Sequence, residues 1–254
     1  PISRNILEVV EQQIPLVPTK DRGSYQSIDL MTPYLDALFA DIDSQAIGEA
    51  HLRVVVDPMY GAASSYFAEL LRRLGCSVKE IHVGPQDDFG GIHPQPADPW
   101  ADECSNVVQE VGADLGILFD GDGDRAAIVD SSGRLLTPHE FVPLMIKHLV
   151  AFRGEMGRVV SSLTCSASIS RQAERWGLET ISVPVGFARI YSEIEAGNVL
   201  LAAEEYGGLC FPQHLLERDG LLAGLYMVEL VAKSGRSIAE LVAEDTAELG
   251  RMCY

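Results

Sequence analysis

The sequence has few basic side chains. Its 254 residues include 19 Lys and Arg against 37 Asp and Glu, which gives a formal net charge of −18. Repulsion from this charge argues against nucleic acid and anionic membranes as partners. It does not exclude a small anionic substrate, because a few local arginines or a bound cation can reverse the field inside a cleft.

Cysteine is also scarce, and no C-x-x-C pair occurs. The odd number and wide spacing of the cysteines indicate reduced thiols in a cytoplasmic protein rather than a disulfide framework or a zinc site. The thiols belong to Cys76, Cys104, Cys165, Cys210 and Cys253.

No long hydrophobic run is present. The longest apolar stretch, residues 221–232, is too short to span a bilayer and contains Glu229. No signal peptide is visible, and the chain begins with Pro1 rather than a methionine. We therefore expect a chain that is a processed or excised piece of a longer protein.

An apolar fraction of 47% is that of a globular protein with a core. Hydrophobic spacing predicts a helix over residues 1–14, a linker over 15–28 and a second helix over 32–41. Strands and helices then alternate. The expected strands are 52–57, 77–83, 113–119, 126–130, 158–163, 180–184 and 199–203. The expected helices are 64–74, 101–111, 138–152, 166–176, 187–196, 219–233 and 237–248.

This order of elements predicts an α/β protein with two tandem three-layer α/β/α domains and mostly parallel sheets. A second series of elements begins near Thr137. Ser237 and Glu240 form a capping-box pattern at the start of the last helix. Because ligands of such sheets bind at the carboxyl ends of strands, the loops at those ends are the candidate sites.

One such loop is acidic. Asp120, Asp122 and Asp124 alternate with two glycines directly after an apolar strand. The glycines allow the chain to curl, so that the three carboxylates converge. Converged carboxylates repel one another unless some are protonated or a cation lies between them. Oxygen ligands select a hard ion, Mg²⁺ or Ca²⁺. An EF-hand does not fit, because its sixth and twelfth positions are Arg125 and Ser131 here.

Residues 120–125 match D-G-D-x-D-R, the metal loop of the α-D-phosphohexomutase family, and the sequence resembles this family of phosphoglucomutases and phosphomannomutases over about residues 25–250. Five further segments are similar to family segments. They are 54–61 (opening strand and turn of the second domain), 112–116 (lead-in to the metal loop), 184–187 (the V-G-F-K loop), 203–208 (the sugar-binding loop G-E-x-S-G) and 218–221 (the K-D-G-I helix start).

The resemblance implies a four-domain isomerase that moves a phosphoryl group between the 1- and 6-positions of a hexose phosphate. The reaction passes through a hexose bisphosphate and a phosphoserine. Residues 1–27 would be the tail of the first domain and a linker, 28–136 the metal-binding second domain and 137–254 the sugar-binding third domain. The serine loop, T-x-S-H-N, is not in this chain. We therefore expect the chain to need the missing first and fourth domains as partners, and to be inactive alone.

The resemblance also implies the site residues. Asp120, Asp122 and Asp124 would bind Mg²⁺, and Arg125 would be catalytic by holding a phosphate oxygen. The expected substrate-binding residues are Gly186, Phe187, Arg189, Glu204, Tyr206 and His214. Two positions depart from the family pattern: Ala188 replaces its lysine, with Arg189 next to it, and Tyr206 replaces its serine.

Two alternatives stay open. A haloacid-dehalogenase-like phosphatase also places D-x-D after an apolar strand, so Asp120 would attack and Asp122 would act as the acid. That motif wants Thr or Val where this chain has Asp124. The second alternative, suggested by Ala188 and Tyr206, is a non-catalytic relative that binds a sugar phosphate.

Overall fold

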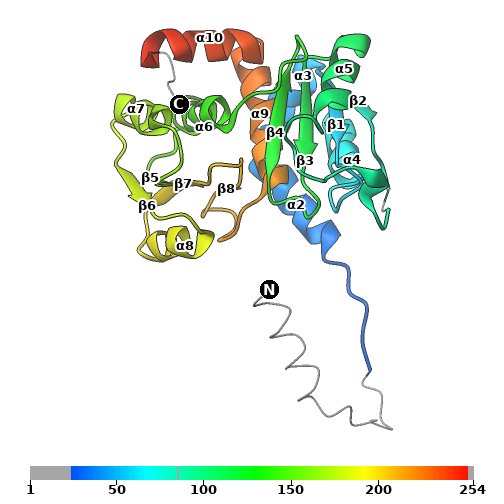
Figure 1. Cartoon of the computed structure of the whole chain (residues 1–254), viewed down its shortest axis with the longest axis horizontal. Helices are drawn as coiled ribbons and strands as arrows, with labels where there is room; N and C mark the ends of the chain where they lie inside the picture. Colours follow the sequence, from blue (N-terminus) through cyan, green and yellow to red (C-terminus); the bar gives the residue numbers. More distant parts are fainter. Residues whose placement is uncertain (1–23, 85, 251–254) are drawn as a thin grey trace. The chain divides into compact units, whose positions relative to one another are not determined.

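A computed structural model describes residues 24–84 and 86–250. The helix expected over residues 1–14 and most of the linker lie outside the described residues. The described residues from Tyr34 onward form one compact unit. Two four-stranded sheets with helices form the compact unit, and the α/β prediction is confirmed (Figure 1).

The first sheet has the strand order β2-β1-β3-β4. Its strands are β1 (Arg53–Asp57), β2 (Ser77–Glu80), β3 (Leu115–Phe119) and β4 (Ala126–Asp130). The first three strands are parallel and β4 is antiparallel to β3. All five residues of β3 are buried, so the acidic loop that follows starts from a rigid strand.

Helices of the first half comprise α2 (Met31–Asp41), α3 (Ser44–Ala50), α4 (Tyr66–Arg73), the 3₁₀ turn η1 (Phe89–Gly91) and α5 (Asp102–Val111). Helix α5 packs on one face of the sheet, where Cys104 and Val108 belong to the same apolar cluster as Val55, Leu118 and Val129. Helix α3 was not among the expected elements. Its N-cap is Asp43, whose carboxylate oxygen accepts a hydrogen bond from the backbone N–H of Ala46 at 3.0 Å.

The second sheet repeats the arrangement in the order β6-β5-β7-β8. Its strands are β5 (Arg158–Ser162), β6 (Thr180–Val183), β7 (Val199–Ala203) and β8 (Leu209–Cys210). Strand β8 is antiparallel to β7 and was not expected, because two residues are too few to give a period. The helices are α6 (Pro138–Lys147), the π-helical η2 (His148–Phe152), α7 (Ala167–Arg175), α8 (Phe187–Glu195), α9 (Gly220–Ser234) and α10 (Ile238–Leu249).

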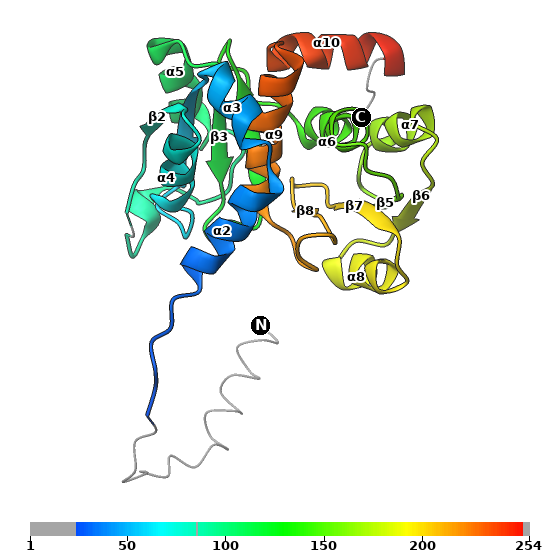
Figure 2. The same ribbon diagram turned by 180° about the vertical axis from the view of Figure 1, so that it is seen from behind.

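Helix α9 is buried along nearly its whole length. It follows the second sheet in sequence, yet it packs on β3 and β4 of the first sheet and also contacts α3, α6 and η2. Figures 1 and 2 show it running between the two sheets. One apolar cluster therefore extends from Ile117 of the first sheet through Leu222 of α9 to Leu201 of the second sheet. A shared core fixes the loops of the two sheets relative to one another.

The expected capping box of α10 is present, with reciprocal contacts between Ser237 and Glu240. Within residues 24–84 and 86–250, no helix combines the length and hydropathy that crossing a bilayer requires.

Candidate metal and sugar site

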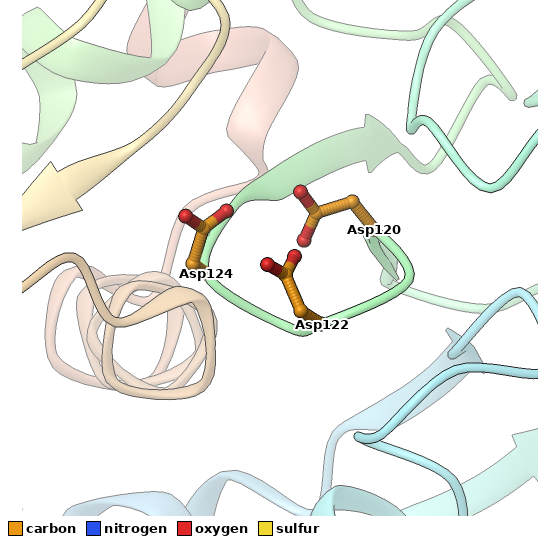
Figure 3. Close-up of side chains that lie close together, drawn as sticks. All are labelled: Asp120, Asp122 and Asp124. Carbon is orange, nitrogen blue, oxygen red and sulfur yellow. The ribbon is translucent and has the colours of Figure 1, made fainter. Parts of the chain in front are cut away.

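The expected metal-binding loop, residues 120–125 and named the metal loop below, connects β3 to β4. The structure brings Asp120, Asp122 and Asp124 together, with one oxygen of each lying within 4.8 Å of the others. Figure 3 shows the three carboxylates pointing toward one another across the loop. Asp120 is buried and Asp122 is exposed, so the cluster opens to solvent on one side.

Asp120 also shapes this loop. Its Oδ1 accepts the backbone N–H groups of Gly123 and Arg125, both at 3.1 Å. Gly123 has φ of 80°, a conformation that glycine adopts at low cost. The loop is thus curled by its own first carboxylate.

The turn after β1 is hydrogen-bonded to the same loop. The backbone N–H of Ala62 donates to the carbonyl of Gly121 at 3.0 Å. A Cβ on Gly61 would lie 2.6 Å from that carbonyl oxygen, so only glycine allows this approach. Residues 54–61, which resemble a family segment, therefore help to position the metal loop.

The electrostatics of the metal loop call for a cation. Burial raises the pKa of Asp120 to about 7, and the carboxylates of Asp124 and Asp122 act in the same direction. Arg125 balances part of this charge, since its Nε lies 3.3 Å from Asp120 Oδ2 and 3.6 Å from Asp124 Oδ1. Asp124 Oδ1 is buried and has no hydrogen-bond partner. A buried carboxylate oxygen that lacks a hydrogen-bond partner, beside two further carboxylates, is a suitable ligand for a hard divalent cation.

The expected sugar-binding loop, residues 204–208 and named the sugar loop below, connects β7 to β8 and lies beside the metal loop. Arg125 and Gly208 form an antiparallel bridge, and the backbone N–H of Ala126 donates to the carbonyl of Gly207 at 3.4 Å. A Cβ on Gly207 would lie 2.7 Å from the carbonyl oxygen of Ala126. The two loops are thus joined backbone to backbone.

The two carboxylates of the sugar loop face different partners. Glu204 pairs with Arg218, with Nη1 to Oε2 at 2.8 Å. Glu205 accepts from the hydroxyl of Ser162 at 2.7 Å. Burial alone would raise the pKa of Glu205, but this hydrogen bond, a backbone hydrogen bond, a further one from Thr164 and the charge of Arg125 together outweigh burial and lower the pKa. Both groups can accept hydrogen bonds as carboxylates.

Arg218 is the residue that sequence reasoning missed. Its Nη2 lies 2.6 Å from Asp124 Oδ2, so one guanidinium contacts both loops. Phe187, an expected substrate contact, lies under it with 5.1 Å from the guanidinium carbon to the ring centre. The available signal was the match of residues 218–221 to a helix start, which places Arg218 just before Asp219, the N-cap of α9.

His214 is held by structural contacts. Its Nε2 lies 3.2 Å from Asp219 Oδ2, and this hydrogen bond raises the pKa of His214. The hydroxyl of Tyr34 donates to the same buried carboxylate at 2.8 Å. His214 thus lies beside the start of α9.

The remaining expected contacts face solvent. Tyr206 is 63% exposed, and Arg189 is exposed on the first turn of α8, where its backbone N–H donates to the carbonyl of Gly186. A cavity of about 350 Å³ adjoins Tyr206 and is lined in part by Glu205 and Thr137. These side chains are free to meet a ligand.

Comparison with known proteins decides the family. The model for phosphoglucomutase/phosphomannomutase, alpha/beta/alpha domain II, matches residues 32–133, and the model for domain III matches residues 137–249. The chain belongs to the phosphoglucomutase/phosphomannomutase family.

Curated relatives agree. The chain is 32% identical over 222 residues to a phosphoglucomutase/phosphomannomutase of Thermococcus kodakarensis, covering 87% of this chain and 48% of that protein. It is 33% identical over 208 residues to a phosphoglucomutase of Rhizobium radiobacter, covering 80% and 38%. The chain thus spans about half the length, or less, of these family members.

Solved structures share the fold. A protein of Thermus thermophilus described as a phosphomannomutase superposes with a TM-score of 0.85 at 31% identity, covering 96% of this chain and 56% of that chain. An N-acetylphosphoglucosamine mutase of Aspergillus fumigatus superposes with a TM-score of 0.59 at 15% identity, covering 84% and 52%, and was solved with GlcNAc-6P and magnesium.

Proposed function

We propose that this chain is the central part of a phosphohexomutase, in which the metal loop binds Mg²⁺ and the sugar loop binds the hexose. The observation that carries the proposal is the adjacency of the two loops through the bridge between Arg125 and Gly208. A phosphoryl group and the sugar hydroxyl that receives it must meet at one place, and these loops offer a cation site beside hydrogen-bond acceptors.

Asp120, Asp122 and Asp124 would hold the ion, and their oxygen donors favour Mg²⁺. When bound, Mg²⁺ neutralises charge on the transferring phosphoryl group. Arg125 would hold a phosphate oxygen, and its Nε contacts with Asp120 and Asp124 fix the orientation of its guanidinium. Arg125 therefore acts from a preorganised position.

Sugar recognition would rest on Glu204 and Tyr206, which can hydrogen-bond to hydroxyl groups. Arg189, exposed on the first turn of α8 beside Gly186 and Phe187, would supply a cation for the substrate phosphate in place of the family lysine. His214 would contribute from the start of α9. Its contact with Asp219 limits the movement of the His214 side chain, so His214 would bind the substrate from a fixed position.

The rest of the enzyme would supply the phosphoserine and the grip on the substrate phosphate, from domains before and after residues 28–136 and 137–254. The chain alone would then bind Mg²⁺ and hexose phosphates or bisphosphates without converting them. The free thiols of Cys76, Cys104, Cys165 and Cys210 support a cytoplasmic location.

An assay of the full-length protein tests the proposal. We expect conversion of glucose 1-phosphate or mannose 1-phosphate to the 6-phosphate with Mg²⁺ and a phosphoserine on the protein. We expect Asp122→Ala to lower the rate by at least about 100-fold. Release of inorganic phosphate with an aspartyl-phosphate on Asp120 would support the phosphatase instead. A full-length protein without a phosphorylatable serine loop would support the non-catalytic relative.

A further inference from the structure

Arg218 connects the metal loop and the sugar loop through one side chain. Nη2 lies 2.6 Å from Asp124 Oδ2, and Nη1 lies 2.8 Å from Glu204 Oε2. Its Nε makes a longer contact of 3.3 Å with Glu217, whose side chain is 55% exposed. The two short contacts dominate, because the exposed one is screened by water.

The guanidinium is held in place from several sides. The backbone of Arg218 bridges Cys210 of β8, and the N–H of Asp219 donates to the carbonyl of Leu209 at 2.8 Å. The ring of Phe187 packs against the guanidinium, and 23% of the side chain is exposed. Arg218 therefore cannot move away from both carboxylates without losing packing.

We propose that Arg218 is a positioning residue that couples cation binding at Asp124 to the negative charge of Glu204. The inference rests on the proposed function and concerns how its two loops communicate. Arg218 holds Asp124 Oδ2, whereas the buried Oδ1 has no hydrogen-bond partner and lies 3.6 Å from Nε of Arg125. Oδ1 is therefore the oxygen available to a cation. A guanidinium stays protonated and has a rigid fork, so it orients both carboxylates and takes no part in proton transfer.

The coupling arises because two carboxylates share one cationic group. When Glu204 keeps its negative charge, Arg218 divides its attraction between Glu204 and Asp124. When Glu204 loses that charge, Arg218 pairs with Asp124 alone and competes with the metal ion for it. A change in the charge of Glu204 therefore alters cation binding at the metal loop through Arg218, although Glu204 is not one of the three clustered carboxylates.

Calorimetric titration of this chain with Mg²⁺ tests the coupling in a double-mutant cycle on Glu204 and Arg218. Glu204→Gln alone should weaken Mg²⁺ binding by at least about fivefold, although Glu204 is not among the carboxylates of the cation cluster. In the Arg218→Met background, the same Glu204→Gln change should alter the affinity by less than about twofold. Arg72→Met on α4 serves as the matched loss of an exposed arginine outside both loops and should leave the full Glu204 effect in place.

Circular dichroism melting checks that each variant is folded. If Arg218→Met does not fold, Arg218→Lys replaces it, and a single ammonium should likewise reduce the Glu204 effect below about twofold. Equal Glu204 effects with and without Arg218 would overturn the coupling and indicate a simple through-space field. Absence of Mg²⁺ binding by the wild-type chain would instead overturn the proposed metal site, and the coupling with it.

Discussion

At the scale of the residue, the metal loop is the feature that the sequence predicts best. Alternating Asp and Gly after a buried strand were enough to expect converging carboxylates, because curl and charge are local properties of residues 120–125. The partner of Asp124 could not be predicted. Arg218 lies far along the chain, and only the fold brings its guanidinium to 2.6 Å from Asp124.

His82 is a second residue whose role depends on the fold. Its Nδ1 lies 2.9 Å from the buried carboxylate of Asp57, and its Nε2 lies 3.1 Å from Glu103. Asp57 Oδ1 also accepts the N–H of Met59, in the turn that leads to Gly61 and the metal loop. His82 thus helps to hold the support of the site.

This contact predicts a pH-dependent stability. The hydrogen bond to Asp57 raises the pKa of His82 in the folded chain. The stabilisation is therefore complete below the unfolded value near 6.5 and is lost as pH rises through the folded pKa. Urea unfolding should show a larger destabilisation by His82→Gln at pH 6 than at pH 9. A difference that does not change with pH would contradict this, and His93→Gln at an exposed histidine is the control.

At the scale of the element, most helices and strands were predictable and their pairing was not. The expected 126–130 strand matches β4, but its antiparallel direction follows from the metal loop, which is too short for a crossover. The expected 138–152 helix changes to π-helical geometry at His148. Helix α3 and strand β8 are too short for a hydrophobic period to reveal.

The start of α9 predicts a sharp steric effect. The N–H of Gly220 donates to the carbonyl of Gly123 at 3.1 Å, and a Cβ there would lie 2.6 Å from the carbonyl oxygen of Arg125. Gly220→Ala should cost about 1–3 kcal/mol of unfolding free energy and weaken Mg²⁺ binding by displacing the metal loop.

Gly48 provides the matched control for this change. It lies inside α3, and its Cβ would make only an ordinary 3.4 Å contact with the carbonyl of Leu74. Gly48→Ala should stabilise the chain by up to about 1 kcal/mol in chemical denaturation. Equal effects of the two substitutions would show that backbone propensity, and not the contact with the metal loop, governs Gly220.

Glu229 joins α9 to the residues around η2 and α3 through contacts that we expect to be sensitive to acid. The buried carboxylate accepts from His148 at 2.9 Å, from Arg153 at 3.2 Å and from the N–H of Asp43 at 3.0 Å. Burial raises the pKa of Glu229, but these partners outweigh it and lower the pKa to about 2. Its stabilisation is present above the unfolded value near 4.3 and is lost as pH falls toward 2.

Removing that charge should be costly at neutral pH. Glu229→Gln should lower the free energy of unfolding by roughly 3 kcal/mol at pH 7, because it leaves Arg153 partly unpaired inside the fold. The loss should shrink as the pH approaches 3, as measured by denaturant unfolding. A constant loss from pH 7 to pH 3 would disprove the assignment of the effect to the charge.

At the scale of the whole molecule, the two sheets share one apolar core through α9. Two successive βαβ series predicted two domains, and the continuous core could not be foreseen, because α9 packs on a sheet that precedes it by many residues. The halves should therefore unfold as one cooperative unit, and the alignment of the metal and sugar loops should depend on that unit.

A destabilising substitution in one sheet should accordingly also destabilise the other sheet. Leu201→Ala in β7 should cost about 2–5 kcal/mol, because Leu201 is fully buried. Hydrogen exchange at Ile117 in β3 should accelerate with it, whereas Leu215→Ala at a 47% exposed position should change neither. Unchanged exchange in β3, or two separate unfolding transitions, would show that the sheets are independent.

The central claim is that residues 120–125 bind a divalent cation. Calorimetric titration of the folded chain with Mg²⁺ should give a single site that Asp122→Ala weakens by at least about tenfold. Asp36→Asn, which removes an exposed carboxylate on α2, should leave that binding unchanged. No binding by the wild-type chain, or equal binding by Asp122→Ala, would contradict the account.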